Sequence, residues 1–214
     1  MQFSSRPPPN IFMIYFIKTP AYETKPKNQD VFEYLTKLGK GLIDPPPLKP
    51  RQLKIAAEIV LYSPAKRVRD GFFTEQDTES VELSSLQEIP FDLKKLVQKQ
   101  NWIKTQSPAV RQGFKKAFIE NHLLKSREKI FEEIVDVLKL CLKAGPDKQI
   151  AVISHSFRLK LIEAFIKSNG QLQKHPKIIH NYIKDAEKTY KFGEGFSIPY
   201  KNLFGLLKNL DIEF

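Results

Sequence analysis

The chain is poor in cysteine and has no long hydrophobic run, and each shortage excludes a class of protein. Cys141 is the only cysteine among 214 residues, so neither an internal disulfide nor a multi-thiolate metal site can form. A reducing compartment, the cytoplasm, is therefore expected. The longest uninterrupted apolar run covers only residues 11–17, which is too short to cross a bilayer. The sequence predicts no insertion into a membrane.

Several familiar site motifs are also absent. The sequence contains no Gly-x-Ser-x-Gly elbow, no Gly-x-x-x-x-Gly-Lys loop and no Gly-x-Gly-x-x-Gly loop. These absences argue against an esterase-type hydrolase, a P-loop nucleotide enzyme and a dinucleotide enzyme. His122, His175 and His180 lack the spacing of metal ligands. We predict neither a metal nor a cofactor.

Basic residues outnumber acidic ones, with 35 Lys and Arg against 24 Asp and Glu, which gives a formal net charge of +11. Such a balance attracts nucleic acid, anionic lipid or phosphorylated small molecules. The sequence has no aromatic RNA-binding motif and no Cys/His finger, so a solvated basic surface is favoured over a dedicated nucleic-acid face. The expected partner is phosphate or a phosphorylated small molecule, with an acidic protein or nucleic acid as the alternative. No oligomeric state is indicated.

Hydrophobic periodicity predicts an α/β fold in which strands and helices alternate. Short runs rich in β-branched and aromatic residues predict buried strands at 11–17, 59–62 and 149–154. This alternation favours a three-layer sandwich, with a mostly parallel sheet and helices on both faces. We predict a single domain over 11–214 after a proline-rich lead at 1–10. A further strand is predicted near 80–83, and helices are predicted at 29–40, 48–57, 64–68, from 93 onward, at 108–143 and at 157–169. The helix at 64–68 is expected to have Ser63 as its N-cap and Pro64 as its first residue. The tail 171–214 is unassigned.

Polar side chains follow three strands that are predicted to be neighbours. Because carboxyl ends of parallel strands meet at one edge of a sheet, we expect these side chains to surround one anion. Arg67 can supply a two-pronged guanidinium to a phosphoryl group, and His155 a donor when it is protonated. The residues that would bind the phosphate are Lys18, Thr19, Ser63, Arg67, His155 and Ser156.

Two of these strand ends carry motifs of a known family. Ser63-Pro64-Ala65-Lys66-Arg67 matches a Ser-Pro-Leu-x-Arg pattern, and the strand that ends in Ser154-His155-Ser156 matches one that ends in Ser-His-Gly. The chain resembles the histidine phosphatase superfamily, in its phosphoglycerate mutase-like branch, over residues 11 to 170. This resemblance implies a phosphoglycerate mutase-like fold and phosphomonoesterase chemistry. It also implies that Glu88, in Leu86-Gln87-Glu88-Ile89-Pro90-Phe91, is the proton donor to the leaving group.

The chain departs from the family at the first motif. Lys18-Thr19-Pro20 stands where the family has Arg-His-Gly, so the histidine that attacks phosphorus is missing. We therefore predict an impaired enzyme or a pseudoenzyme that still binds phosphate or a phosphoester. Two routes to turnover stay open, attack by His155 itself or hydrolysis by a water that Glu88 activates. The alternative is a non-catalytic scaffold or regulatory module.

Overall fold

A central sheet organises the structure, which is a computed structural model describing residues 12–19, 30–47, 53–75, 77–185 and 190–213. The strand order is β5-β3-β6-β1-β7. Four strands run parallel and β7 runs antiparallel to β1. The strands are β1 (Met13–Lys18), β3 (Ile59–Tyr62), β5 (Glu79–Glu82), β6 (Ile150–Ser154) and β7 (Gly195–Pro199). The mostly parallel sheet predicted from the sequence is confirmed.

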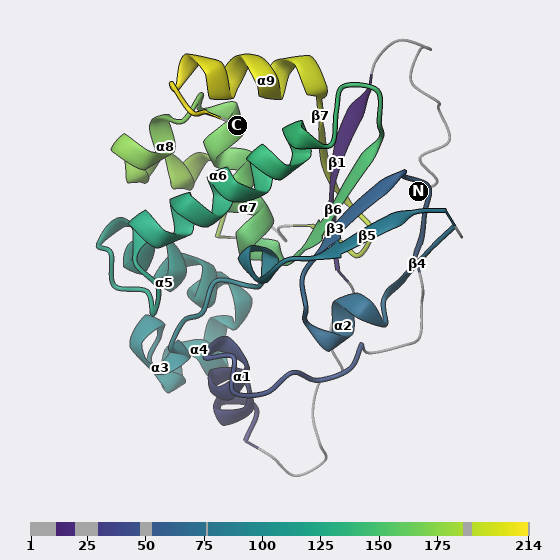
Figure 1. Cartoon of the computed structure of the whole chain (residues 1–214). Coiled ribbons are helices and arrows are strands. Elements are labelled where there is room, and N and C mark those ends of the chain that lie inside the picture. The colour runs from purple at the N-terminus through teal and green to yellow at the C-terminus, as the bar shows by residue number, and fades with distance from the viewer. Residues whose placement is uncertain (1–11, 20–29, 48–52, 76, 186–189, 214) are drawn as a thin grey trace.

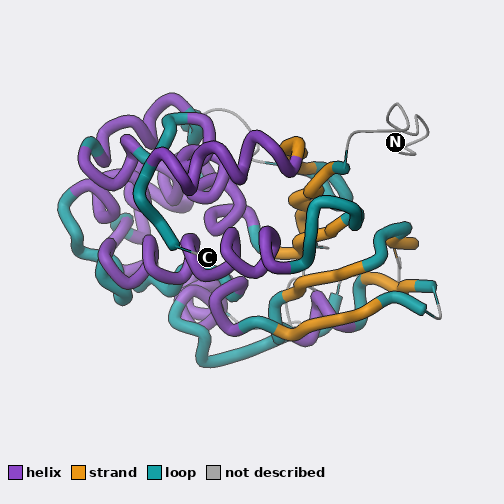
Figure 2. The backbone as a smooth tube through the Cα atoms, turned by 45° about the horizontal axis from the view of Figure 1, so that its top comes forward, coloured by secondary structure: helices purple, strands orange, loops and turns teal. Residues whose placement is uncertain are grey.

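Side chains that alternate along the strands pack into two separate cores. One core contains Ile14 and Phe16 of β1, and helices α6 (Arg127–Lys143), α7 (Ser156–Lys167) and α9 (Tyr200–Asn209) cover it. Figure 1 shows these helices beside the sheet, and Figure 2 shows most helices gathered on one side of the strands.

The opposite face of the sheet has a much thinner cover. Its core includes Ile17 of β1 and Val68 of α2 (Lys66–Arg69). A small parallel sheet of β2 (Leu53–Ile55) and β4 (Phe72–Thr74) adds Leu53 and Phe72 to this side. Helices therefore lie on both faces, as predicted, but the two outer layers are unequal.

Four helices form a separate group, which we call the cap: α1 (Val31–Gly39), α3 (Leu93–Leu96), α4 (Lys99–Thr105) and α5 (Ser107–Ile119). Phe32 and Leu93 are buried at its centre. Helices α3 and α5 approach so closely that a Cβ at Gly113 would lie 2.3 Å from the carbonyl oxygen of Leu96. The remaining short elements are the α-helix α8 (Gln171–Lys174) and the 3₁₀-helices η1 (Ser84–Leu86) and η2 (Pro176–Asn181).

Two local predictions are wrong. The sequence predicted a helix over 48–57, but residues 53–55 form β2, which pairs with β4. Three alternating residues carry too little periodicity to identify a strand, and pairing with distant residues decides the conformation. The second error concerns Ser63, which does not cap α2. That helix begins at Lys66 after Ala65 with no side-chain cap, because the Ser63 hydroxyl is engaged by His155.

Most other elements were predicted to within a few residues. The strands β1, β3, β5 and β6 and the helix α7 are confirmed, while the tail contributes β7 and α9. The single helix predicted over 108–143 is divided into α5 and α6, because Asn121 adopts a left-handed conformation (φ 59°) after α5 and Ser126 caps the start of α6. The proline-rich lead lies outside the described residues. No helix in the described part of the chain is long and apolar enough to span a membrane.

Candidate anion site

The three predicted strand ends lie side by side because β6 is between β1 and β3. Backbone hydrogen bonds between neighbouring segments continue just past the ends of β1 and β3. The Thr19 amide donates to the Ser154 carbonyl at 2.9 Å, and the Ser63 amide donates to the Ile153 carbonyl at 3.1 Å. The segments after β1 and β3 thus flank His155, which follows β6.

His155 contacts both residues that the sequence placed after β3. Its Nε2 lies 2.8 Å from Ser63 Oγ, and its Nδ1 lies 2.5 Å from Arg67 Nη2. A guanidinium can only donate, so Nδ1 is the acceptor. Nε2 then carries the proton and donates it to the Ser63 hydroxyl oxygen. The imidazole is neutral, and both of its nitrogens are hydrogen-bonded.

The charges around His155 favour this neutral form. Burial lowers the pKa of His155 well below 6.5, and the positive charges of Arg67, Arg158 and Lys18 lower it further. His155 is only 3% exposed. In the absence of an anion the ring is therefore neutral at neutral pH.

A cavity of about 610 Å³ opens beside these residues. Ser63 does not line it, because this residue is fully buried and holds the far nitrogen of the imidazole. The other predicted site residues converge on the cavity, whose lining includes Lys18, Thr19, Arg67, Glu88, His155 and Ser156.

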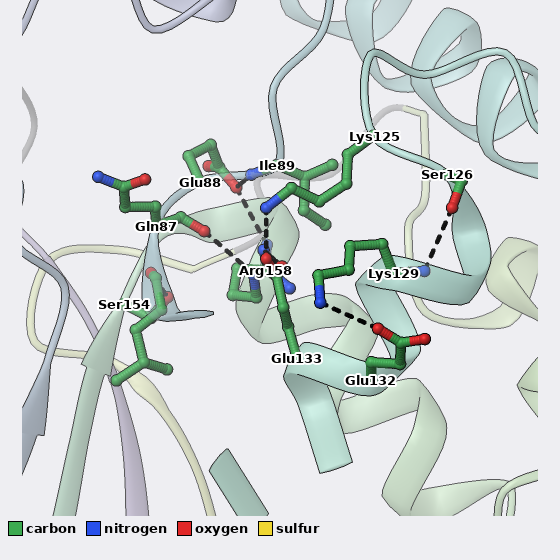
Figure 3. A network of polar contacts seen from close by, with 11 residues as sticks. Gln87, Glu88, Ile89, Lys125, Ser126, Lys129, Glu132, Glu133, Ser154 and Arg158 are labelled. Carbon is green, nitrogen blue, oxygen red and sulfur yellow. Dashed lines mark hydrogen bonds and ion pairs between the residues drawn. The ribbon is translucent and has the colours of Figure 1, made fainter. Parts of the chain in front are cut away.

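Glu88 holds the N-terminus of α7 (Figure 3). Its carboxylate accepts N–H groups from Arg158 at 3.1 Å, from Phe157 at 3.4 Å and from Ile89 at 3.2 Å. Burial raises the pKa of Glu88 although Arg67 and these three N–H groups lower it. The first turn of α7 therefore binds a carboxylate of the protein itself, and the amides of Phe157 and Arg158 are not available to a ligand.

Arg158 was missed in the sequence analysis. It is fully buried, and its Nε donates to the Gln87 carbonyl at 3.0 Å while Nη2 pairs with Glu133 at 2.7 Å. Lys125 makes a second ion pair with the same Glu133 carboxylate, at 2.5 Å (Figure 3). A signal was present, because Arg158 lies on the apolar stripe of its helix, four residues before the buried Ile162.

Lys18 is fixed by the segment before β7. Its Nζ donates to the Tyr190 carbonyl at 2.8 Å. The Tyr190 hydroxyl bonds to Glu163 of α7, and Lys160 lies 4.0 Å from the centre of the Tyr190 ring. Nothing in the sequence connected Tyr190 with Lys18, because the two residues are far apart along the chain and only the fold brings them together.

Among the residues that the structure describes, no three His, Cys, Asp or Glu side chains gather as metal ligands would. Of the first motif, Lys18 and Thr19 are described, and Pro20 lies outside the described residues.

Comparison with known proteins gives few matches. No family model matches the chain, and no curated protein matches it. Among solved structures, one match is a histidine-to-alanine mutant of phosphoserine phosphatase from Entamoeba histolytica in complex with phosphoserine. The two chains are 15% identical, with a TM-score of 0.44, and the match covers 88% of this chain and 95% of that one. A similarity of this size assigns neither a family nor a reaction.

Proposed function

We propose that the protein binds phosphate or a phosphoester at this cavity, as a divergent relative of the histidine phosphatases that does not form a phosphohistidine. The observation that carries the proposal is the direct contact between Arg67 and His155 at the cavity wall, with Lys18 close enough to lower the pKa of the histidine. The residues come from three separate segments and share one edge of the sheet.

The electrostatics of this edge favour an anion. Lys18 and Arg67 line the cavity with positive charge. Burial is the main cause of the lowered pKa of His155, and repulsion by Arg67, Arg158 and Lys18 lowers this pKa further. A bound dianion would offset that repulsion and raise the pKa of His155 again. A protonated Nδ1 would then donate to the anion once the Arg67 guanidinium, which donates to Nδ1 in this structure, turns to the anion as well.

No activated nucleophile for covalent turnover is found among the described residues that line the cavity. Thr19, which replaces the histidine of the family motif, is 2% exposed, and a threonine hydroxyl is un-ionised near neutral pH. His155 is a poor substitute because Nδ1 accepts from Arg67 and Nε2 carries the proton. Glu88 retains a property suited to a general acid, a raised pKa beside the cavity. Slow hydrolysis by water is the route to turnover that this arrangement leaves.

Isothermal titration with inorganic phosphate tests the proposal. We expect wild-type protein to bind phosphate and the Arg67→Ala variant to bind at least tenfold more weakly. Arg69→Ala is the matched control, because Arg69 lies on the same short helix with 52% of its side chain exposed and does not line the cavity. Equal loss in both variants would mean that general surface charge attracts the anion.

The alternative, a scaffold whose basic surface contacts an acidic protein or nucleic acid, predicts no phosphate binding by the wild type. It also predicts that Arg67→Ala changes only stability.

We also propose that residues 11–214 form one domain and that the protein works in the cytoplasm. The single cysteine supports the second point, because a chain with one cysteine gains no internal disulfide from an oxidising compartment.

A further inference from the structure

The cavity has an apolar half that a phosphate ion alone would leave unfilled. Leu35 and Leu38 of α1, Trp102 of α4 and Val110 of α5 line it, together with Phe157 of α7. All five side chains are partly exposed, in contrast to the buried centre of the cap. Apolar surface that lines a cavity is best covered by an apolar group.

From this division of the cavity we infer that the ligand is a phosphomonoester whose alcohol is aromatic or branched aliphatic. The inference rests on the proposed phosphate site and adds the chemistry of the group attached to phosphorus.

The apolar wall is fixed by ring packing. Phe157 stacks on Phe114 with ring centres 4.0 Å apart and an interplanar angle of 7°. Phe91 meets both rings edge-on, at 6.0 Å from Phe157 and 6.1 Å from Phe114. Trp102 packs against Phe32 with ring centres 5.5 Å apart. The surface that faces the cavity is therefore held in place before a ligand arrives, which lowers the entropic cost of binding.

The anionic and apolar halves are continuous along the chain. Phe157 follows His155 by two residues, and its amide donates to Glu88, which lines the cavity as well. A ligand with its phosphoryl group at Arg67 and His155 therefore shares one cavity with the aromatic side chains. A sugar phosphate would place hydroxyl groups against leucine, tryptophan and phenylalanine side chains, where they would lose hydrogen bonds to water.

Two further charged residues line the cavity, and both have partners within the protein. Arg111 donates from Nε and Nη2 to the Asp185 carbonyl. Lys191 lies 3.6 Å from the Glu194 carboxylate. The protein itself therefore holds Arg111 through a main-chain carbonyl and Lys191 through a carboxylate.

A matched pair of probes measures the contribution of the apolar half. Methylphosphonate and benzylphosphonate carry the same phosphonate group, differ by a phenyl ring and cannot be hydrolysed. We expect calorimetry to give at least tenfold tighter binding for benzylphosphonate, which corresponds to 1.4 kcal/mol. Trp102 is the only tryptophan of the chain, so benzylphosphonate should also change the intrinsic fluorescence, and methylphosphonate much less.

Variants of residues on the cap test which side chains produce the tighter binding of benzylphosphonate. Trp102→Ala should abolish most of the difference between the two probes, because benzylphosphonate loses affinity and methylphosphonate has no ring to lose contacts. Ile103→Ala, at the neighbouring position on α4 with 60% of the residue exposed, should keep the full difference. Leu38→Asn provides a second cavity variant on another helix should Trp102→Ala not fold.

The outcomes separate the inference from the proposed function. Equal affinity for both probes, with both lost in Arg67→Ala, would overturn the apolar ligand and leave the phosphate site standing. Failure of inorganic phosphate and both phosphonates to bind would overturn the phosphate site, and the inference with it.

Discussion

At the scale of single residues, the site is defined by the protonation state of His155. Arg67 occupies one ring nitrogen and Ser63 the other, and burial with three nearby cations keeps the pKa low. The sequence predicted that Arg67 and His155 would lie together, and they do. It could not predict the tautomer, because this depends on which atoms approach the ring. It also placed Ser63 against the anion, whereas the structure places it behind the imidazole.

The lowered pKa of His155 has a consequence for stability. The unfolded chain takes up a proton near pH 6.5, while the folded protein does so only at lower pH. The contribution of neutral His155 is therefore present above pH 6.5 and is lost as the pH falls below it. We expect the free energy of unfolding of the wild type to drop, relative to His155→Gln, by about 1.4 kcal/mol between about pH 7.5 and about pH 5.5.

Urea denaturation of both proteins at the two pH values measures this difference. The other three histidines are present in both chains and cancel. A difference that does not change with pH would show that folding does not lower the pKa of His155, contrary to its burial beside three cations.

At the scale of elements, the start of α7 connects the site to the large helical layer. Glu88 binds the first amides of the helix, and Arg158 of the first turn binds Gln87 and, through Glu133, the helix α6. Periodicity predicted the helices themselves because each is long and has a clear apolar stripe. The segment at 48–57 failed because its structured part is a strand of three residues whose partner lies elsewhere in the sequence.

Removing Arg158 should be costly because its partners are buried with it. Arg158→Met leaves the Glu133 carboxylate, 14% exposed, without one of its two cations and the Gln87 carbonyl without its donor. We expect a loss of about 3 kcal/mol in the free energy of unfolding.

The control for this variant is Lys129, which lies on α6 one turn before Glu133 (Figure 3). Lys129 pairs with Glu132 at 3.0 Å, but both side chains are well exposed. Lys129→Met should cost less than about 1 kcal/mol in the same denaturation experiment. Similar losses in the two variants would contradict the structural role given to Arg158.

At the scale of the whole molecule, the site exists because a parallel sheet brings distant segments to one edge and the cap closes over them. The positions of the motifs directly after predicted strands indicated that these segments meet at one edge of the sheet. The poorly patterned regions 92–125 and 171–200 are where the sequence favours a cap, and α3, α4 and α5 lie in the first of them. Helix α1 could not be assigned to the cap, because its periodicity predicts a helix but not which part of the fold it faces. Leu35, Leu38 and Trp102 acquire their role only when these helices pack together above the strand ends.

The same architecture predicts a gain of function. The combined change Lys18→Arg, Thr19→His and Pro20→Gly restores an imidazole and a two-pronged cation next to Arg67, with Glu88 as the acid. We expect hydrolysis of 4-nitrophenyl phosphate at least about 100-fold faster than by wild-type protein.

The control is the same triple variant with Arg67→Ala added, which should lose this activity. A triple variant with a native circular dichroism spectrum and no added activity would show that the rest of the site is not arranged for phosphoryl transfer.

The most direct measurement is a crystal structure of the protein soaked in tungstate, because the heavy anion mimics phosphate and identifies itself by its scattering. We expect density in the cavity within hydrogen-bonding distance of Arg67 and His155, and within about 4 Å of Lys18. An empty cavity, or tungstate bound only to lysines on the outer surface, would contradict it.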